Sequence, residues 1–256
     1  MNENVNFSVL RYESIPSTND EAKRLADLGA KEGTVLVADR QTAGRGRLDR
    51  LFVSPAGCGL YATVIRRPTV APEHLSLLTV AAAVAVAEAA EAVCGVPLGI
   101  KWVNDVYSEK GKVSGILVET SFSPAGGVAY AVLGFGVNLF PWTDRPAEAG
   151  PAASLLSVAP CEEKRKEMRD ALLFEVLKRF FAYYGLLAEK PFMEEYRRRS
   201  VLVGKEVTVF SPQDKEKESP LYTATVTAID GDGALCLRTS NGEEKRLTFG
   251  EVSLQV

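Results

Sequence analysis

Lys-Val-Ser-Gly-Ile-Leu-Val-Glu-Thr at residues 112–120 and Val-Ala-Tyr-Ala-Val-Leu-Gly-Phe-Gly-Val at residues 128–137 decide the fold of this chain. Both stretches are short, rich in β-branched and aromatic residues, and bounded by polar residues or glycines, so each predicts a strand. Because so little sequence lies between them, they are expected to pair as an antiparallel hairpin. A sheet built around this hairpin is the centre of the predicted fold.

The segments around this hairpin predict further strands and helices. Stretches of the same strand-like kind lie at residues 34–38, 59–65 and 99–103. Helical spacing or alanine-rich composition predicts helices at residues 18–28, 72–93 and 162–187. The first helix has capping-box spacing from Thr18 to Glu21 and ends at Gly29, and the second helix is closed by Gly95. Because helices and paired strands are segregated, we expect an α+β fold with a mixed, largely antiparallel sheet covered on one side by helices.

The chain changes character after three arginines at residues 197–199. Alternating strands are predicted at residues 206–210, 222–229 and 234–238, with glycines in tight turns between them. They indicate a small β-barrel over residues 205–256, separate from a main domain over residues 1–200. Because Glu194 and Glu195 stand directly before the arginines on a predicted helix, we expect the arginines to form a solvated face.

The composition restricts the class of protein. With 256 residues and 46% hydrophobic content, the chain can bury one main core and a second small one. A net charge of −3, from 30 basic and 33 acidic residues, argues against non-specific nucleic-acid binding. The four cysteines are widely scattered and there is one histidine, so neither a disulfide framework nor a zinc site is expected.

The sequence predicts neither a targeting segment nor a membrane segment. Residues 1–12 lack the basic start and the apolar core of a signal peptide. The longest apolar stretch, residues 75–87, is too short to span a bilayer. We therefore expect a cytoplasmic protein with no membrane partner.

The candidate site begins at residues 41–47, which read Gln-Thr-Ala-Gly-Arg-Gly-Arg. The glycines allow close backbone approach and positive φ angles, while Arg45 and Arg47 bring permanent, multi-donor cations. This pattern is typical of an anion-binding loop, but Gly-Arg pairs also occur in solvated turns and RNA-binding segments. A nucleic-acid-binding module is therefore an alternative, disfavoured by the balanced charge and the lack of interleaved exposed aromatic residues.

Three further segments accompany this loop, at residues 17–19 (STN), 101–105 (KWVND) with 112–119 (KVSGILVE), and 134–138 (GFGVN). In this order and spacing they resemble the biotin protein ligase family, enzymes that adenylate biotin and attach it to a carrier lysine. Residues 228–235, followed by Gly-Glu-Val at 250–252, are similar to the SH3-like C-terminal domain of the same ligases. The resemblance spans nearly the whole chain and implies a class II synthetase-like catalytic domain before that small domain.

The resemblance implies that biotin and ATP are the substrates, with Mg²⁺ on the triphosphate. A carboxylate is already ionised at neutral pH, so its attack on the α-phosphate needs charge stabilisation rather than a base. The family equivalents of Arg47 and Lys112 stand where the carboxylate meets the α-phosphate, and we expect both to be catalytic. Arg50 is expected to reach the phosphates. Mg²⁺ is expected to be bound through phosphate oxygens and water, without a metal motif in the protein.

The biotin site needs polar partners for a neutral ureido ring inside an apolar slot. Ser17 and Thr18 at a helix N-terminus, with the amide of Gln41, supply donors and acceptors, while Gly115 and Gly134 leave room for the bicycle. Asn19 is expected to orient the turn. The resemblance implies that the loop contributes the backbone of Arg45 and Gly46 to the biotin side. The biotin-binding set implied by the resemblance is Ser17, Thr18, Asn19, Gln41, Gly44, Arg45, Gly46, Arg47, Lys112, Gly115 and Gly134.

The nucleotide-binding set and the transfer step also follow from the resemblance. Asp105 is expected to orient or deprotonate the incoming carrier lysine, whose amine must be neutral to attack. Residues 152–155 are similar to the loop that lines the adenine. The residues expected to bind ATP are Arg47, Arg50, Asn104, Lys112 and Asn138.

The expected partner is a biotin carboxyl carrier protein, or another biotinyl domain of a carboxylase, and the expected state is a monomer or a homodimer. Some bacterial relatives carry an N-terminal DNA-binding domain. Because the ligase pattern begins within the first dozen residues, we expect a monofunctional ligase with no DNA partner.

A lipoate or octanoate protein ligase is the nearest alternative, with a similar fold and the same way of activating a carboxylate. It would not need the Gly-Arg-Gly-Arg loop or ureido partners such as Ser17 and Gln41. The chain also departs from the family pattern, which usually has glycine, tryptophan and proline, and often alanine, where this chain has Asp49, Phe52, Val103 and Ser114. An ion pair from Asp49 to Arg47 or Arg50 is a hypothesis for the empty enzyme.

Overall fold

The computed structural model of the chain describes residues 7–68, 74–124, 126–142, 152–214 and 218–254, without the side chain of Asp49. The α-helices are α1 Thr18–Asp27, α2 Ser76–Cys94, α3 Glu162–Gly185 and α4 Phe192–Arg198. The main sheet contains β1 Ser8–Ile15, β2 Thr34–Gln41, β3 Gly59–Arg66, β4 Gly99–Lys101, β5 Asp105–Ser108, β6 Gly111–Phe122 and β7 Val128–Asn138. The C-terminal strands are β8 Glu206–Phe210, β9 Pro220–Ile229, β10 Leu235–Arg238, β11 Glu244–Leu247 and β12 Glu251–Leu254.

The main sheet forms around the predicted hairpin. β6 and β7 pair antiparallel from Ser114 opposite Val137 to Phe122 opposite Val128, and β3 pairs with the other edge of β7. The described strands are ordered β1-β2-β3-β7-β6-β5-β4, and β1 and β2 are the parallel pair. The predicted α+β fold with a mixed, largely antiparallel sheet is confirmed.

One predicted strand boundary is wrong, and it lies beside the candidate site. The strand predicted at residues 99–103 stops at Lys101, and Asp105 begins the next strand, opposite Lys101. The chain reverses through residues 102–104, so that β4 and β5 form a second short hairpin. Asn104 and Asp105 thus lie at a tight turn on the edge of the sheet.

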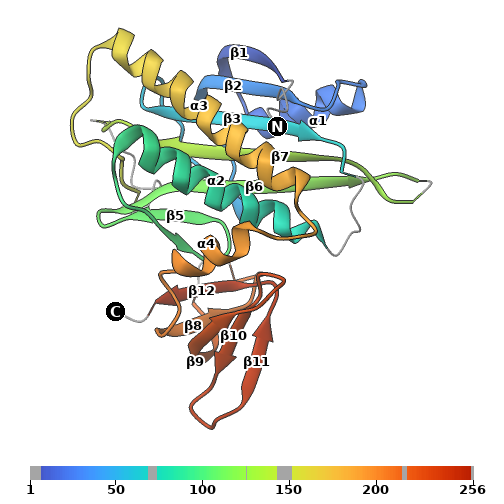
Figure 1. Cartoon of the computed structure of the whole chain (residues 1–256), viewed down its shortest axis with the longest axis vertical. Coiled ribbons are helices and arrows are strands. Elements are labelled where there is room, and N and C mark those ends of the chain that lie inside the picture. The colour runs from blue at the N-terminus through green and yellow to red at the C-terminus, as the bar shows by residue number, and fades with distance from the viewer. Residues whose placement is uncertain (1–6, 69–73, 125, 143–151, 215–217, 255–256) are drawn as a thin grey trace.

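Helices lie on both faces of the main sheet, not on one as predicted. α2 and α3 pack together over the face that carries Val35 and Val64 (Figure 1). Side chains alternate along a strand, so Leu36 and Ile65 point to the opposite face, where they pack against Ala22 of α1. Because α1 is short, it covers only part of that face and leaves the neighbouring part for a pocket.

By length and composition alone, helix α2 could cross a membrane. The apolar stretch at residues 75–87, on which the sequence analysis is based, is shorter than this helix. In the structure 67% of its apolar window is buried inside the protein. Its side chains from Leu77 to Ala90 pack in the main core with α3, and left-handed Gly95, at φ 69°, ends the helix as predicted. Its predicted start at Pro72 lies outside the described residues. α2 is therefore the central core helix.

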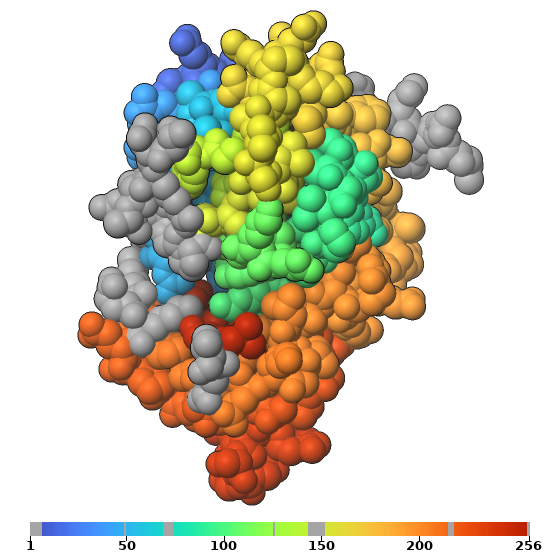
Figure 2. Space-filling view, turned by 90° about the vertical axis from the view of Figure 1, so that its left-hand side faces the viewer, coloured from blue at the N-terminus to red at the C-terminus, as the bar shows by residue number. Residues whose placement is uncertain are grey.

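The C-terminal strands form a small antiparallel sheet in the order β11-β10-β9-β8-β12. In the described residues it is an open sheet rather than a closed barrel, because β11 and β12 are its two edges. It is anchored to the rest of the chain by hydrogen bonds of 2.8 Å from the Trp102 indole to the Gly233 carbonyl and from Arg197 Nε to the Ile229 carbonyl. In Figure 2 its red segment lies directly against the green middle of the chain.

The solvated face predicted for the arginines at residues 197–199 is wrong for Arg199. Its side chain is 4% exposed and pairs with Glu91 of α2 and Glu195 of α4, both at 2.6 Å. The reason is tertiary: α4 packs on α2, and its C-terminal end turns Arg199 back towards Glu91. Arg198 is exposed, as predicted.

The stability that the Glu195 carboxylate contributes to this cluster depends on pH. Hydrogen bonds from Arg198, and the charge of Arg199, lower the pKa of Glu195 from 4.5 to about 2, although partial burial opposes the shift. Because the pKa is depressed in the folded state, the contribution of Glu195 to stability is complete above pH 4.5 and is lost as the pH falls towards 2. Urea unfolding at a series of pH values should therefore show a weaker acid dependence for Glu195→Gln than for the wild type. Equal slopes would contradict this assignment.

Candidate active site

A cavity of about 700 Å³ lies beside α1, between the main sheet and the C-terminal sheet. Its lining combines glycines of β6 and β7 with the start of α1, the loop at residues 45–52 and residues 250–253. The cavity brings together most of the predicted site residues, namely Ser17, Thr18, Asn19, Gln41, Arg45, Gly46, Arg47, Arg50, Asn104, Asp105, Lys112, Gly115 and Gly134.

One end of the cavity is neutral and polar. The N-cap of α1 is Ser17, whose hydroxyl accepts a hydrogen bond from the Asp20 amide at 3.4 Å, so the capping role predicted for Thr18 is wrong. Thr18 is the first helical residue instead, and its amide and hydroxyl both donate to Gln41 Oε1, at 2.8 and 3.0 Å. Gln41 is held in turn by Ser54, at 2.8 Å. Buried, uncharged donors and acceptors of this kind suit a neutral polar ring.

Asn19 occupies the space above Gly134. Its Nδ2 donates to Glu119 Oε2 at 2.8 Å, and its Oδ1 accepts from the buried hydroxyl of Thr63 at 2.7 Å. A Cβ atom at residue 134 would overlap the Asn19 side chain. The space that we predict for a ligand at Gly134 is therefore occupied by Asn19. At Gly115 the fit is looser, because a Cβ atom there would lie 3.4 Å from its nearest neighbour, the Lys112 side chain.

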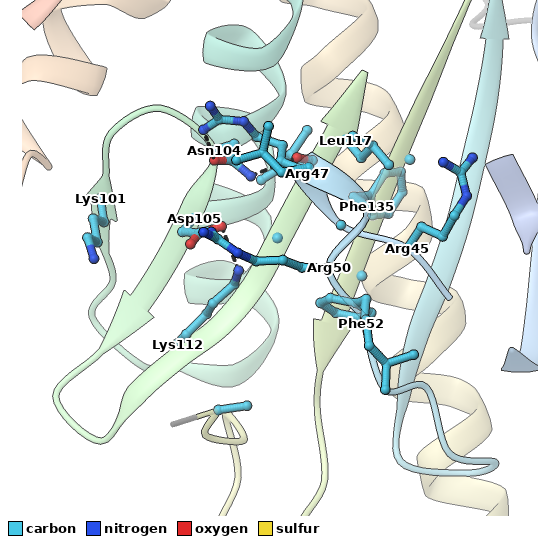
Figure 3. Close-up of a pocket in the computed structure, with 18 of the residues that line it drawn as sticks. Arg45, Arg47, Arg50, Phe52, Lys101, Asn104, Asp105, Lys112, Leu117 and Phe135 are labelled. Carbon is cyan, nitrogen blue, oxygen red and sulfur yellow. Dashed lines mark hydrogen bonds and ion pairs between the residues drawn. The ribbon is translucent and has the colours of Figure 1, made fainter. Parts of the chain in front are cut away.

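The other end of the cavity carries the cations. Arg47 donates to Asn104 Oδ1 at 3.0 Å and to the Gly250 carbonyl at 3.1 Å. Lys112 Nζ lies 2.7 Å from Asp105 Oδ1, and Figure 3 shows both pairs side by side. Arg47 and Lys112, which are 65 positions apart in the sequence, thus converge at the tight turn between β4 and β5.

Arg50 reaches the same end from the loop. Its Nη1 lies 2.8 Å from Glu251 Oε2, and Glu251 Oε1 lies 3.8 Å from Arg47 Nη2. The Glu251 side chain is 11% exposed, so the C-terminal sheet places a nearly buried carboxylate beside both arginines. The ion pair hypothesised for Asp49 lies outside the described residues.

Arg45 points away from Arg47 and Arg50, as Figure 3 shows. Its guanidinium lies 2.5 Å from Asp20 Oδ1 and 3.2 Å from both oxygens of Glu119. Burial raises the pKa of Glu119, but the hydrogen bond from Asn19 and the charges of Lys23 and Arg45 outweigh it and lower the pKa. Because the side chain is engaged by carboxylates, this arrangement is compatible with the backbone role predicted for Arg45.

Two predicted site residues do not line the cavity. Gly44 lies at the base of the loop, where a Cβ atom would overlap the Phe52 carbonyl, so this glycine serves close packing of the loop against itself. Asn138 is buried at the end of β7, and its carbonyl accepts from the Leu155 amide at 2.9 Å. Of the loop predicted to line the adenine, Ala152 does reach the cavity.

Sequence reasoning missed several lining residues. The Phe52 ring lies over Gly136, where any Cβ atom would overlap it, and packs edge-on against Tyr61 at 6.4 Å. Phe52 stands where the family pattern usually has tryptophan, and nothing in the sequence marks it as a residue of the site. Gly250 and Glu251 belong to the predicted C-terminal motif, but the sequence carries no signal that joins them to Arg47.

The chain is similar to known proteins along most of its length. Residues 12–138 match the Biotin/lipoate A/B protein ligase family, and residues 203–255 match the biotin protein ligase C-terminal domain. The bifunctional ligase/repressor BirA of Bacillus spizizenii is 33% identical over 235 residues, which cover 90% of this chain and 69% of that protein. The biotin--[acetyl-CoA-carboxylase] ligase of Paracoccus denitrificans is 34% identical over 241 residues, which cover 89% and 93%.

A solved structure shares the whole architecture. The biotin protein ligase from Aquifex aeolicus in complex with biotin and ATP has a TM-score of 0.74 and 29% identity, and the match covers 97% of this chain and 98% of that one. The fold, the cavity and these likenesses define a ligase enzyme. The chain belongs to the biotin protein ligase family.

Proposed function

We propose that this protein is an ATP-dependent ligase that adenylates biotin to biotinyl-5'-AMP and transfers the biotin to a lysine of a carboxylase biotinyl domain. One observation carries the proposal: Arg47 and Lys112 converge on one end of a cavity whose other end is neutral and polar. The family membership supports the same reaction, and the names of the relatives support the carboxylase partner.

In the first step, an oxygen of the ionised biotin carboxylate attacks the α-phosphorus of ATP. A bond forms between this oxygen and the α-phosphorus, the bond from the α-phosphorus to the bridging oxygen breaks, and pyrophosphate leaves. Two anionic groups must meet, so the enzyme has to offset charge at the point where they join. Arg47 is held by Asn104 and Lys112 by Asp105 at one end of the cavity, which supports this role for both cations. Cations fixed before the substrates arrive need little reorganisation during the reaction.

Mg²⁺ accompanies ATP in this proposal. Among the described residues, no group of three or more His, Cys, Asp or Glu side chains is placed to hold an ion. The cavity carboxylates of Asp105 and Glu251 face Lys112 and Arg50. This donor set fits an ion held mainly by phosphate oxygens and water, which would offset phosphate charge.

In the second step, the neutral amine of the carrier lysine attacks the acyl carbon, a carbon–nitrogen bond forms, and AMP leaves. We propose that Asp105 orients this amine and takes up the proton that it loses. Its place supports this role, because it lies at the cavity beside the proposed phosphate cation Lys112.

Exchange of labelled pyrophosphate into ATP tests the first step, since that step is reversible. We expect exchange with biotin and Mg²⁺ and none with lipoate or octanoate in place of biotin. Exchange with lipoate or octanoate but not biotin would identify the alternative ligase instead. No exchange with any of the acids would contradict the proposed reaction.

Ligands should also protect residues 45–52, the arginine-rich loop, from proteolysis. In the empty protein, polar and ionic contacts hold the loop, and biotin with ATP would add partners to the residues that line the cavity. If cleavage requires local opening, ligand at 100 times its Kd should slow trypsin cleavage after Arg45, Arg47 or Arg50 by about 100-fold. Cleavage after exposed Lys164 of α3 serves as the control. Equal loop cleavage with and without ligand would contradict an ordering role.

Several expectations from the sequence are retained as part of the proposal. They are the cytoplasmic location, the monomeric or homodimeric state, and the absence of DNA and membrane partners. The division into domains at residues 200–205 is likewise proposed, and the two separate sheets support it.

A further inference from the structure

Glu119 of β6 contacts three side chains, from α1 and from the loop at residues 45–52, although it does not line the cavity. Its carboxylate accepts from Asn19 Nδ2 at 2.8 Å, lies 2.9 Å from Lys23 Nζ, and lies 3.2 Å from Arg45 Nη2. The side chain is 24% exposed, so these charge-assisted contacts are only partly screened by water. One strand residue thus binds a helix and a loop at once.

The helix and the loop are two walls of the cavity. Asn19 follows Ser17 and Thr18 at the start of α1, and it is confined between Glu119, Thr63 and the face of Gly134. Arg45 stands in the loop next to Gly46, and Asp20 is its second carboxylate partner. Without Glu119, Asn19 would lose its anionic partner, and Arg45 would lose one of its two carboxylate partners and keep the half-exposed Asp20.

We propose that Glu119 is a positioning residue for the acid substrate, which fixes the distance between the start of α1 and the arginine-rich loop. The effect on the KM for biotin rests on the proposed function, whereas the effect on the position of the loop does not. Lys23 of α1 binds the same carboxylate at 2.9 Å and Asp20 at 3.0 Å, and it is not among the residues that line the cavity. The chain therefore offers a control that removes a contact to Glu119 without releasing either wall.

The test compares Glu119→Gln with Lys23→Gln. Glutamine keeps the shape and a hydrogen-bond acceptor for Asn19 but loses the charge that holds Arg45. We expect Glu119→Gln to raise the KM for biotin about tenfold, the order of one lost hydrogen bond to a charged group, with little change in the KM for ATP. Lys23→Gln should leave both values near those of the wild type. Equal effects of the two variants, or equal changes in the two KM values, would overturn the proposal.

Trypsin cleavage after Arg45 in the protein without ligands gives a readout that does not depend on activity. Glu119→Gln should be cleaved there faster than the wild type and Lys23→Gln, while cleavage after Lys164 stays the same. In a double-mutant cycle for biotin affinity, measured by calorimetry, Arg45→Met and Glu119→Gln should together cost less than the sum of the single changes. Faster cleavage without biotin binding by the wild type would contradict the proposed function alone. Unchanged cleavage, or strict additivity, would overturn the role of Glu119.

Discussion

Lys112→Ala is expected to slow biotin adenylation about 100-fold while leaving the protein folded. One charge-stabilising donor at a reacting centre typically contributes about 3 kcal/mol to lowering the barrier. Lys112 is 31% exposed, and its ion pair with Asp105 is expected to contribute about 0–1 kcal/mol to stability. The substitution is therefore expected to raise the barrier to adenylation by far more than it lowers the free energy of unfolding.

Single-turnover formation of biotinyl-5'-AMP measures this effect directly. Lys110→Ala is the matched control, because Lys110 stands two residues earlier, is exposed, and binds Ser157 Oγ at 2.6 Å outside the cavity. Its variant should adenylate biotin at the wild-type rate. A normal rate for Lys112→Ala, or an equal loss in both variants, would show that Lys112 does not act at the phosphate.

The largest expected effect on stability comes from Glu91→Gln. Glu91 binds the 4% exposed Arg199 through two hydrogen bonds of 2.6 Å, and these lower the pKa of Glu91. A glutamine can accept only one of them and turns its own NH₂ group towards the guanidinium. Breaking a buried ion pair on one side typically costs about 3 kcal/mol, and we expect a loss of that order in the free energy of unfolding.

Urea unfolding at pH 7 measures this loss, with Glu194→Gln as the control. Glu194 is exposed on the same helix as Glu195, and its substitution is expected to change stability by less than about 0.5 kcal/mol. A change in Glu91→Gln no larger than in Glu194→Gln would mean that the buried arginine is satisfied by Glu195 and by the carbonyl of Leu98.

Features of the fold that depend on neighbouring residues could be predicted from the sequence. The β6–β7 hairpin and the left-handed glycines at positions 29 and 95 follow from local composition and turn chemistry. The packing of α1 on the second face of the sheet and the burial of Arg199 could not be predicted. Both depend on contacts between segments far apart in the chain, such as Arg199 and Glu91.

The same distinction holds for the site. Ser17, Gln41 and the arginine-rich loop could be predicted as parts of the site, because each belongs to a short segment whose chemistry depends on neighbouring residues. The contacts of Arg47 with Gly250, and of Arg50 with Glu251, join residues about 200 positions apart, for which no pattern in a single sequence exists. The peptide bond between Trp102 and Val103 is cis. The residues of this chain do not indicate it, although the family pattern usually has proline, the residue that favours cis bonds, where this chain has Val103.

The contact between the arginine-rich loop and Glu251 also bears on synthesis of the protein at the ribosome. Chains emerge from their N-terminus, and earlier parts can fold while later parts are still being made. α1, the loop and the main sheet are complete by residue 138, yet the carboxylate that faces Arg47 and Arg50 arrives more than 100 residues later. During that interval both guanidinium groups lack Glu251. In the nascent ligase, Arg47 and Arg50 therefore receive this carboxylate only when β12 has been translated and has paired with β8.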